Sequence, residues 1–207
     1  MWGSHVKFRK LFGAVFLGLT LALATPAMSQ LGQSDAYKFL QAVKDAKGQD
    51  VTDMLNKPGS TIIDSHATGS GETALHIVVK RSDDTWLRFL LQHGADPNAR
   101  DNDGTTPLML AVNQNCLDCV ETLIAAKADV DRANNRGETP LIRAVQMRNV
   151  TMVRDLLKAG ADPDETDHIA GLSARDYAKR DGRSPAIVKM LADAPKTHKA
   201  AVEGPQL

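Results

Sequence analysis

The stretch Gly137–Val145 reads GETPLIRAV, and two near-copies precede it, GTTPLMLAV from Gly104 and GETALHIVV from Gly71. Each phrase begins 33 residues after the previous one. A fixed period of this length is the sequence signature of repeat proteins, in which every repeat is one small structural unit. The fold is therefore decided by what a single period specifies.

Each phrase specifies a turn followed by a helix. Its glycine suits a tight turn because glycine tolerates positive φ. The threonine two residues later suits a helix N-cap, because its hydroxyl accepts a free backbone N–H. Pro107 and Pro140 stand at the first helical position, where a missing N–H does no harm. Leu141, Ala144 and Val145 then recur at one-turn spacing, which predicts one buried helical face.

A second helix completes each period. It carries a Leu-Leu or Leu-Ile pair that we expect to face the core. Gly94 and Gly160 follow two of these helices and suit a left-handed helix end, whereas Lys127 holds the same position in the repeat between them. The second helices are expected over residues 85–92, 118–126 and 151–159.

A 33-residue unit that reads G-x-T-P-L and then LL-x-x-GAD-x-N resembles the ankyrin repeat. The motifs cover residues 67–167, and weaker units flank them, with Arg175 replacing the repeat leucine in the last one. One unit cannot bury its own apolar face, so units stack, and Arg175 is expected to give the end unit a polar outer side. The resemblance implies an all-α ankyrin-repeat solenoid of about five stacked helix-turn-helix units. The expected domain spans residues 30–194, with units at 35–66, 67–100, 101–133, 134–166 and 167–194.

The N-terminus is organised differently. Lys7, Arg9 and Lys10 precede an apolar run of 14 residues, and small residues follow it. This is the layout of a secretory signal peptide, expected over residues 1–29 with cleavage after Ala27 or Ser29. The run is shorter than the ~20 residues that span a bilayer, although an uncleaved membrane anchor is an alternative. The sequence thus predicts export, to the periplasm of a bacterium or to the outside of the cell.

Composition excludes other classes of protein. Aromatic residues make up only 4% of the chain, which favours small close-packed helices over a sandwich built on large rings. The formal net charge is zero, and removing residues 1–29 takes away three basic groups and no acid, which leaves −3. Neither value points to nucleic acid or to a membrane surface. Residues 195–207 contain few apolar side chains and are expected to be disordered.

The resemblance implies a non-enzymatic protein–protein interaction module. In this family the turn tips and the first helices form a concave face that binds another protein. Arg81, Arg136 and Met147 are the favoured anchors, since Arg and Met are enriched at interfaces. We expect a monomer that binds a partner protein and needs no cofactor or metal. The predicted partner-binding residues are Lys80, Arg81, Asn102, Asp103, Thr105, Asn113, Gln114, Asn135, Arg136, Glu138, Gln146 and Met147.

The two cysteines form the motif Cys116-Leu-Asp-Cys119 at the start of a second helix. A helix N-terminus lowers the pKa of a thiol, and C-x-x-C in this place is the layout of dithiol oxidoreductases. Three interpretations stay open. They are a structural disulfide, which an oxidising compartment would preserve, two plain thiols, and a redox-linked accessory of a cell-envelope protein. Two cysteines cannot complete a four-ligand zinc site.

No catalytic constellation emerges from the remaining residues. The six histidines have no metal-ligand spacing, and His76 is expected to be a buried hydrogen-bond partner of Thr73. No Ser/His/Asp set or close carboxylate pair is apparent, so we do not expect an enzyme. A site assembled across several repeats is the remaining enzymatic alternative.

Overall fold

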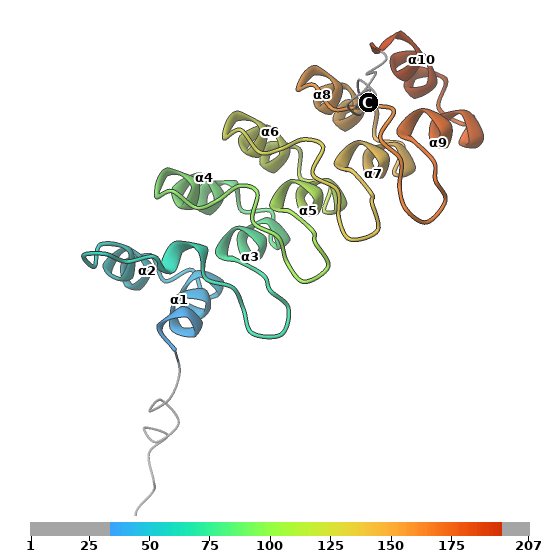
Figure 1. The fold of residues 1–207 in the computed structure, drawn as a ribbon. Helices are drawn as coiled ribbons and strands as arrows, with labels where there is room; N and C mark the ends of the chain where they lie inside the picture. Colours follow the sequence, from blue (N-terminus) through green and yellow to red (C-terminus); the bar gives the residue numbers. More distant parts are fainter. Residues whose placement is uncertain (1–33, 196–207) are drawn as a thin grey trace, which may run out of the picture. The chain divides into compact units, whose positions relative to one another are not determined.

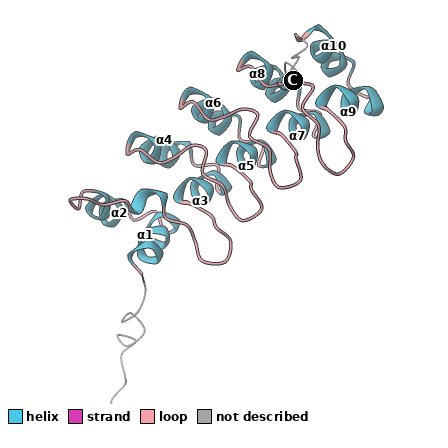
Figure 2. Cartoon of the chain, in the orientation of Figure 1, coloured by secondary structure: helices cyan, strands magenta, loops and turns pink. Residues whose placement is uncertain are grey.

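The computed structural model describes residues 34–195 of the 207-residue chain. The predicted signal peptide, residues 1–29, lies outside the described residues, as does the predicted tail beyond Pro195. Within the described range the chain forms ten α-helices, one short 3-10 helix and an isolated antiparallel bridge between Thr166 and Ser173 (Figure 2). The predicted all-α fold class is confirmed.

The helices form five consecutive pairs. The first helices of the pairs, α1, α3, α5, α7 and α9, lie in one layer, and each contacts the next. The second helices, α2, α4, α6, α8 and α10, form a second layer beside it (Figure 1). Long turns project from the first layer. The bounds are α1 Asp35–Lys44, α2 Gly48–Leu55, η2 Ile62–Asp64, α3 Ala74–Lys80, α4 Asp84–Gln92, α5 Pro107–Asn113, α6 Leu117–Ala125, α7 Pro140–Gln146, α8 Val150–Lys158, α9 Ala174–Asp181 and α10 Pro185–Asp193.

The predicted caps set the helix starts. The hydroxyls of Thr106 and Thr139 each accept a hydrogen bond of 3.2 Å from the backbone N–H three residues on, and the following proline is the first helical residue. The second helices begin one residue earlier than expected. The reason is that Asp83 and Asn149 act as N-caps, accepting from the backbone N–H groups of Trp86 and Met152.

One core runs through the whole stack. The repeat leucines Leu75, Leu108 and Leu141 are buried together with leucines of the second helices. Burying such a side chain stabilises the fold by about 1.5–3 kcal/mol relative to leaving it exposed. Ala111 and Ala144 are also buried, and their small size lets neighbouring helices approach closely. The core therefore joins each repeat to the next.

The helix end at Lys127 keeps the geometry of its glycine-containing neighbours. Lys127 has φ +65°, and Gly94 and Gly160 have +89° and +96°. The backbone N–H of Lys127 still donates to the Ile124 carbonyl at 3.0 Å. The stack thus imposes a left-handed conformation on a residue that adopts it at a cost of about 1–2 kcal/mol.

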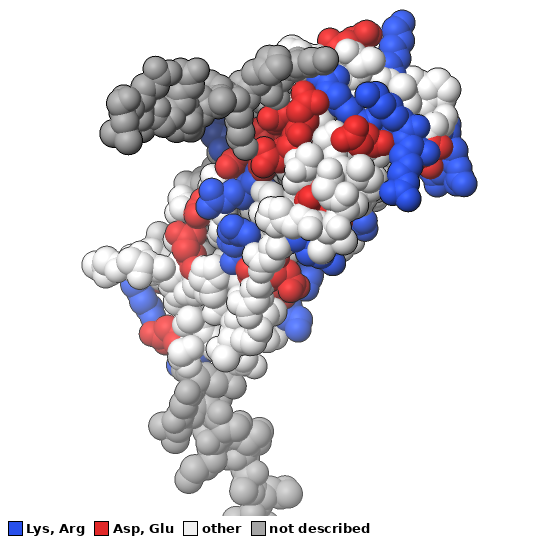
Figure 3. Space-filling view, turned by 45° about the vertical axis from the view of Figure 1, so that its right-hand side comes forward, with Lys and Arg blue, Asp and Glu red and all other residues white. Residues whose placement is uncertain are grey.

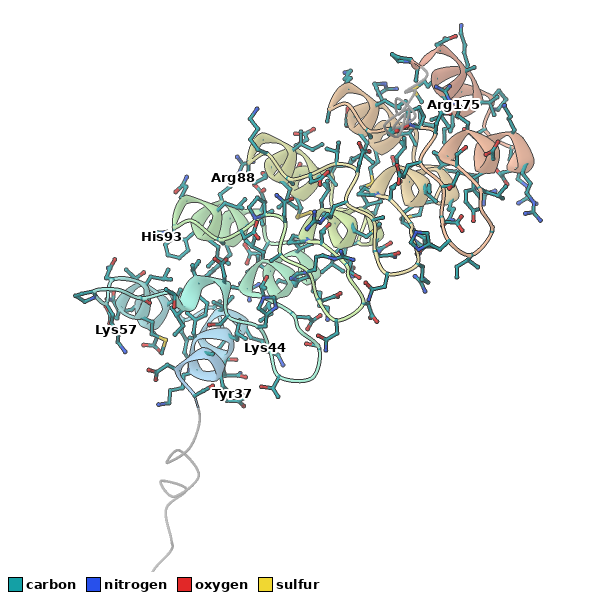
Figure 4. The ribbon with its side chains drawn as sticks, in the orientation of Figure 1. Tyr37, Lys44, Lys57, Arg88, His93 and Arg175 are labelled. Carbon is teal, nitrogen blue, oxygen red and sulfur yellow. A yellow bond between two sulfur atoms is a disulfide. The ribbon has the colours of Figure 1, made fainter. Side chains whose placement is uncertain are left out.

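Arg175 differs from its expected role as a solvated end residue. Its side chain is only 10% exposed and forms a 2.7 Å ion pair with Asp164. Its guanidinium also donates to the carbonyls of Ala194 and Pro195, each at 2.9 Å (Figure 4). Arg175 therefore fastens α9 to the end of α10, because the carbonyls that close α10 point toward it.

Candidate functional site

The inner face is the surface formed by α1, α3, α5, α7, α9 and the turns that precede them. Its turns are joined in a ladder. The backbone N–H of Asn102 donates to Ser70 and its side-chain amide to Gly69, at 3.0 and 2.6 Å. Asn135 repeats the pattern, with its backbone N–H donating to Asp103 and its side-chain amide to Asn102. These two asparagines fix the spacing of the turns.

A close approach between turns explains the glycine at their tips. Gly137 has φ +77°, and a Cβ atom placed on it would lie 2.6 Å from the ring of His168 and 2.7 Å from its backbone nitrogen. The His168 N–H donates to the Arg136 carbonyl at 2.8 Å, so the last turn joins the same ladder. The turns therefore form a rigid edge to the inner face.

The predicted positions on the first helices are linked across repeats. Lys80 pairs with Glu72 at the start of its own repeat. Arg143 of α7 donates to the side-chain oxygen of Asn113 in the preceding repeat at 2.7 Å and to that of Gln146 in its own repeat at 3.2 Å. Gln114 is exposed at the end of α5. The structure thus brings Asn113 and Gln146 together on one face, joined by an arginine that was absent from the predicted set.

The three favoured anchors have different environments. Arg81 donates to the carbonyls of Val43 and Lys44 at 2.8 and 3.1 Å and pairs with Asp83, so it closes the end of α1. Met147 is half-buried and packs against the core. Arg136 is exposed and pairs with Glu138 at 2.8 Å, while Asp103 is exposed and Thr105 half-buried. Arg136 is therefore the anchor that extends furthest into solvent, and partner binding by any of these residues stays a prediction.

A cavity of about 590 Å³ opens on the inner face between α1, α3 and the loop before α3. We call it the α1–α3 groove. Tyr37, Leu40, Gln41 and Lys44 line it from α1, and Figure 4 labels the first and last of them. Tyr37 is 51% exposed although its ring is large and apolar. The groove is thus a hollow of the inner face with an exposed aromatic ring among its lining residues.

Sequence reasoning missed the residues that α1 contributes to this groove. The unit that contains α1 lacks the turn motif, and for that reason no partner-binding residue was predicted in it. A signal was nevertheless present. Tyr37, Leu40, Gln41 and Lys44 are spaced i, i+3, i+4 and i+7, which places them on one face of a helix.

Charge is mixed over the rest of the surface. Figure 3 shows Lys and Arg interspersed with Asp and Glu on the face turned toward the viewer. Among residues 34–195, no cluster of three or more His, Cys, Asp or Glu side chains is arranged to hold a metal ion. In the same range, none of the helices combines the length and apolar character that crossing a membrane requires.

The two cysteines form a disulfide with a Cα–Cα distance of 5.3 Å. Cys116 is the N-cap of α6, and it occupies the position of Asp83 and Asn149 in the neighbouring repeats. Cys116 is 8% exposed and Cys119 is fully buried. The disulfide thus joins the N-cap residue to the first turn of α6. In the neighbouring repeats a side-chain oxygen of Asp83 or Asn149 makes this link by accepting a backbone N–H.

His76 is fully buried, and its predicted contact with Thr73 is confirmed. Its Nδ1 accepts from the Thr73 backbone N–H at 3.2 Å, which leaves Nε2 to donate to the Thr105 carbonyl of the next repeat at 3.0 Å. Burial lowers the pKa of His76, although the Thr105 carbonyl and the charges of Asp101 and Glu72 act in the opposite direction. His76 is therefore a neutral link between repeats.

Stacked two-helix repeats with projecting turns define a solenoid repeat protein. A family model described as "Ankyrin repeats (3 copies)" matches residues 27–134 and 87–167. The chain belongs to the ankyrin repeat family. Repeats of this family generally mediate protein–protein interactions and are typically non-enzymatic.

Three relatives match the chain over short stretches. A putative ankyrin repeat protein of Pyrobaculum aerophilum is 48% identical over 50 residues, 24% of this chain and 19% of the relative. A BTB/POZ domain and ankyrin repeat-containing protein of Oryza sativa is 40% identical over 78 residues, 38% of this chain and 16% of the relative. The human neurogenic locus notch homolog protein 4 is 44% identical over 54 residues, which are 26% of this chain and 3% of the relative. The chain thus matches less than a fifth of the length of each relative.

Proposed function

We propose that this chain is an exported, non-enzymatic binding module that holds a partner protein on its inner face. The observation that carries the proposal is the α1–α3 groove, a 590 Å³ hollow on that face with a half-exposed tyrosine. Tyrosine is enriched among the residues that dominate interface energetics. The ladder of turns supports the proposal, because a rigid face loses little conformational freedom on binding.

Three of the ionisable groups whose pKa is shifted have structural roles, which supports binding rather than catalysis. His76 links two repeats, and Asp167 accepts from the Tyr177 hydroxyl at 2.7 Å and from two backbone N–H groups of its own loop. Asp176 forms a capping box with Ser173 at the start of α9. The pKa of each group is lowered: burial lowers that of His76, and the accepted hydrogen bonds lower those of Asp167 and Asp176 against the effect of their burial.

Site-specific crosslinking tests the choice of face. A photoreactive amino acid at Gln114 would report on the inner face, and the same group at Arg154, exposed on α8, would report on the second layer. In the exporting cell, we expect Gln114 to crosslink to one partner protein and Arg154 to crosslink to none. A partner that attaches from Arg154 and not from Gln114 would refute the inner-face assignment.

Export rests on the N-terminal sequence and has its own test. N-terminal sequencing of the protein recovered from the cell envelope or medium should begin at Met28 or Gln30, the residues that follow the two expected cleavage points. Recovery of a chain that retains Lys7 in the membrane fraction would favour the alternative of an uncleaved anchor.

A redox-linked accessory role for Cys116 and Cys119 is the second candidate. The disulfide and its place at the start of α6 favour it. The burial of Cys119 opposes it, because an exchange reaction requires access to a sulfur atom. Incubation of the oxidised protein with a small dithiol decides between the roles. Slow reduction that requires unfolding indicates a structural disulfide, and fast reduction of the native protein indicates a redox role.

A further inference from the structure

We propose that the α1–α3 groove takes an acidic segment of the partner protein, with an apolar side chain of that segment seated beside Tyr37. This inference rests on the proposed function and adds the chemical class of the segment. It is carried by the charges and the apolar surface of the described residues that line the groove.

The wall of the groove carries more positive than negative charge. Three of its lining residues are basic, namely Lys44, Lys80 and Arg81, and one, Glu72, is acidic. Lys80 pairs with Glu72, which removes the acid as a partner for the other two cations. Arg81 pairs with Asp83, so the positive charge that remains on the groove is that of Lys44.

The carboxylates of Asp45, which follows α1, and of Asp83, which Arg81 links to the end of α1, are already engaged. Asp83 binds Arg81 at 3.2 Å. Asp45 accepts from Gln41 at 2.8 Å and lies 3.6 Å from Lys47. Within residues 34–195 the Lys44 ammonium group forms no ion pair. Lys44 is exposed, so its ammonium group is available to an external carboxylate.

The floor of the groove supplies apolar contact. Leu40 is buried beneath it, Ile77 is half-buried on the opposite wall, and the exposed ring of Tyr37 stands at the rim. A bound side chain would remove apolar surface of all three residues from water. The combination of an apolar floor and a basic rim suits a segment in which an apolar residue is flanked by Asp or Glu.

The chain's own ends are poor candidates for this occupant. Residues 1–33 contain no Asp or Glu, and residues 196–207 contain one, Glu203, against Lys196 and Lys199. A basic segment would be repelled by Lys44, whose charge no ion pair offsets among the described residues. The complementary segment is therefore supplied by another protein.

Selection from a random peptide library displayed on phage tests the proposal with the purified protein as bait. We expect the selected peptides to contain an apolar residue flanked by acidic residues. Binding of the selected peptides should weaken about tenfold in Lys44→Gln and in Tyr37→Ser, and should weaken as salt is added. Lys158→Gln and Ile169→Ser are matched controls, since both residues are exposed far from the groove, and both should bind as the wild type does.

Several results would overturn the proposal. These are recovery of no peptide, selection of peptides without acidic residues, and equal binding to Lys44→Gln and wild type. Self-association of the purified protein that Lys44→Gln abolishes would identify a second copy as the occupant instead. If Gln114 still crosslinks to a partner while Lys44→Gln leaves that crosslink unchanged, the inner-face function stands and the acidic-segment inference alone falls.

Discussion

Replacing His76 with methionine should destabilise the protein and remove a pH dependence of its stability. The change deletes the hydrogen bond accepted from the Thr73 N–H and the one donated to the Thr105 carbonyl. A neutral hydrogen bond contributes about 1 kcal/mol, and a buried group left unpaired costs about 1–3 kcal/mol. Methionine fits the site, since Met109 is buried at the same position of the next repeat, and its apolar burial offsets part of the loss. We expect a net loss of about 2 kcal/mol at neutral pH.

The pH dependence follows from the lowered pKa of His76. The unfolded chain takes up a proton near the ordinary value of 6.5, before the folded protein does. The contribution of His76 to the free energy of unfolding should therefore be complete above about pH 6.5. Below that pH it should fall by up to about 1.4 kcal/mol per pH unit, until the pKa of His76 in the folded protein is reached. The pKa values of Asp167 and Asp176 lie below 3.8, so their contributions are lost only in stronger acid.

Urea unfolding followed by circular dichroism, at several values between about pH 7.5 and pH 5, measures both effects. The difference in free energy of unfolding between wild type and His76→Met should be largest at the highest pH and shrink as the pH is lowered. A difference that stays constant over this range would refute the assignment of His76 as a neutral link. Equal stability of the two proteins at neutral pH would refute the hydrogen-bond argument itself.

Two further predictions concern the ends of helices. The double variant Cys116→Asn/Cys119→Ala replaces the disulfide with the hydrogen-bond cap of the neighbouring repeats. Loss of the constraint on this short loop should lower the free energy of unfolding by up to about 2 kcal/mol. Unfolding at the same urea concentration as the oxidised wild type would contradict this prediction. Lys127→Gly should raise the free energy of unfolding by about 0.5–1 kcal/mol, because it relieves the φ of +65° at an exposed position. A thermal melt checks it, and a lower melting temperature would show that the lysine stem makes a stabilising contact.

The repeat could be predicted from the sequence because its signals are local. A threonine cap, a proline at the first helical position and leucines at one-turn spacing act within a few residues, so they specify each helix pair without knowledge of its neighbours. The same locality explains the error at the second helices. Asp83 and Asn149 were not recognised as caps, which shifted the expected starts by one residue.

The sequence alone determined the helix pair, its period of 33 residues and the stacking that the period requires. Only the tertiary structure decided which exposed residues serve the fold. Arg81 closes α1 from 37 and 38 residues away, and Arg175 holds the end of α10. It also decided that Tyr37 and Lys44 share a groove with α3. Such contacts depend on the distance and rotation between neighbouring repeats, which the packing of buried side chains sets and no local motif encodes.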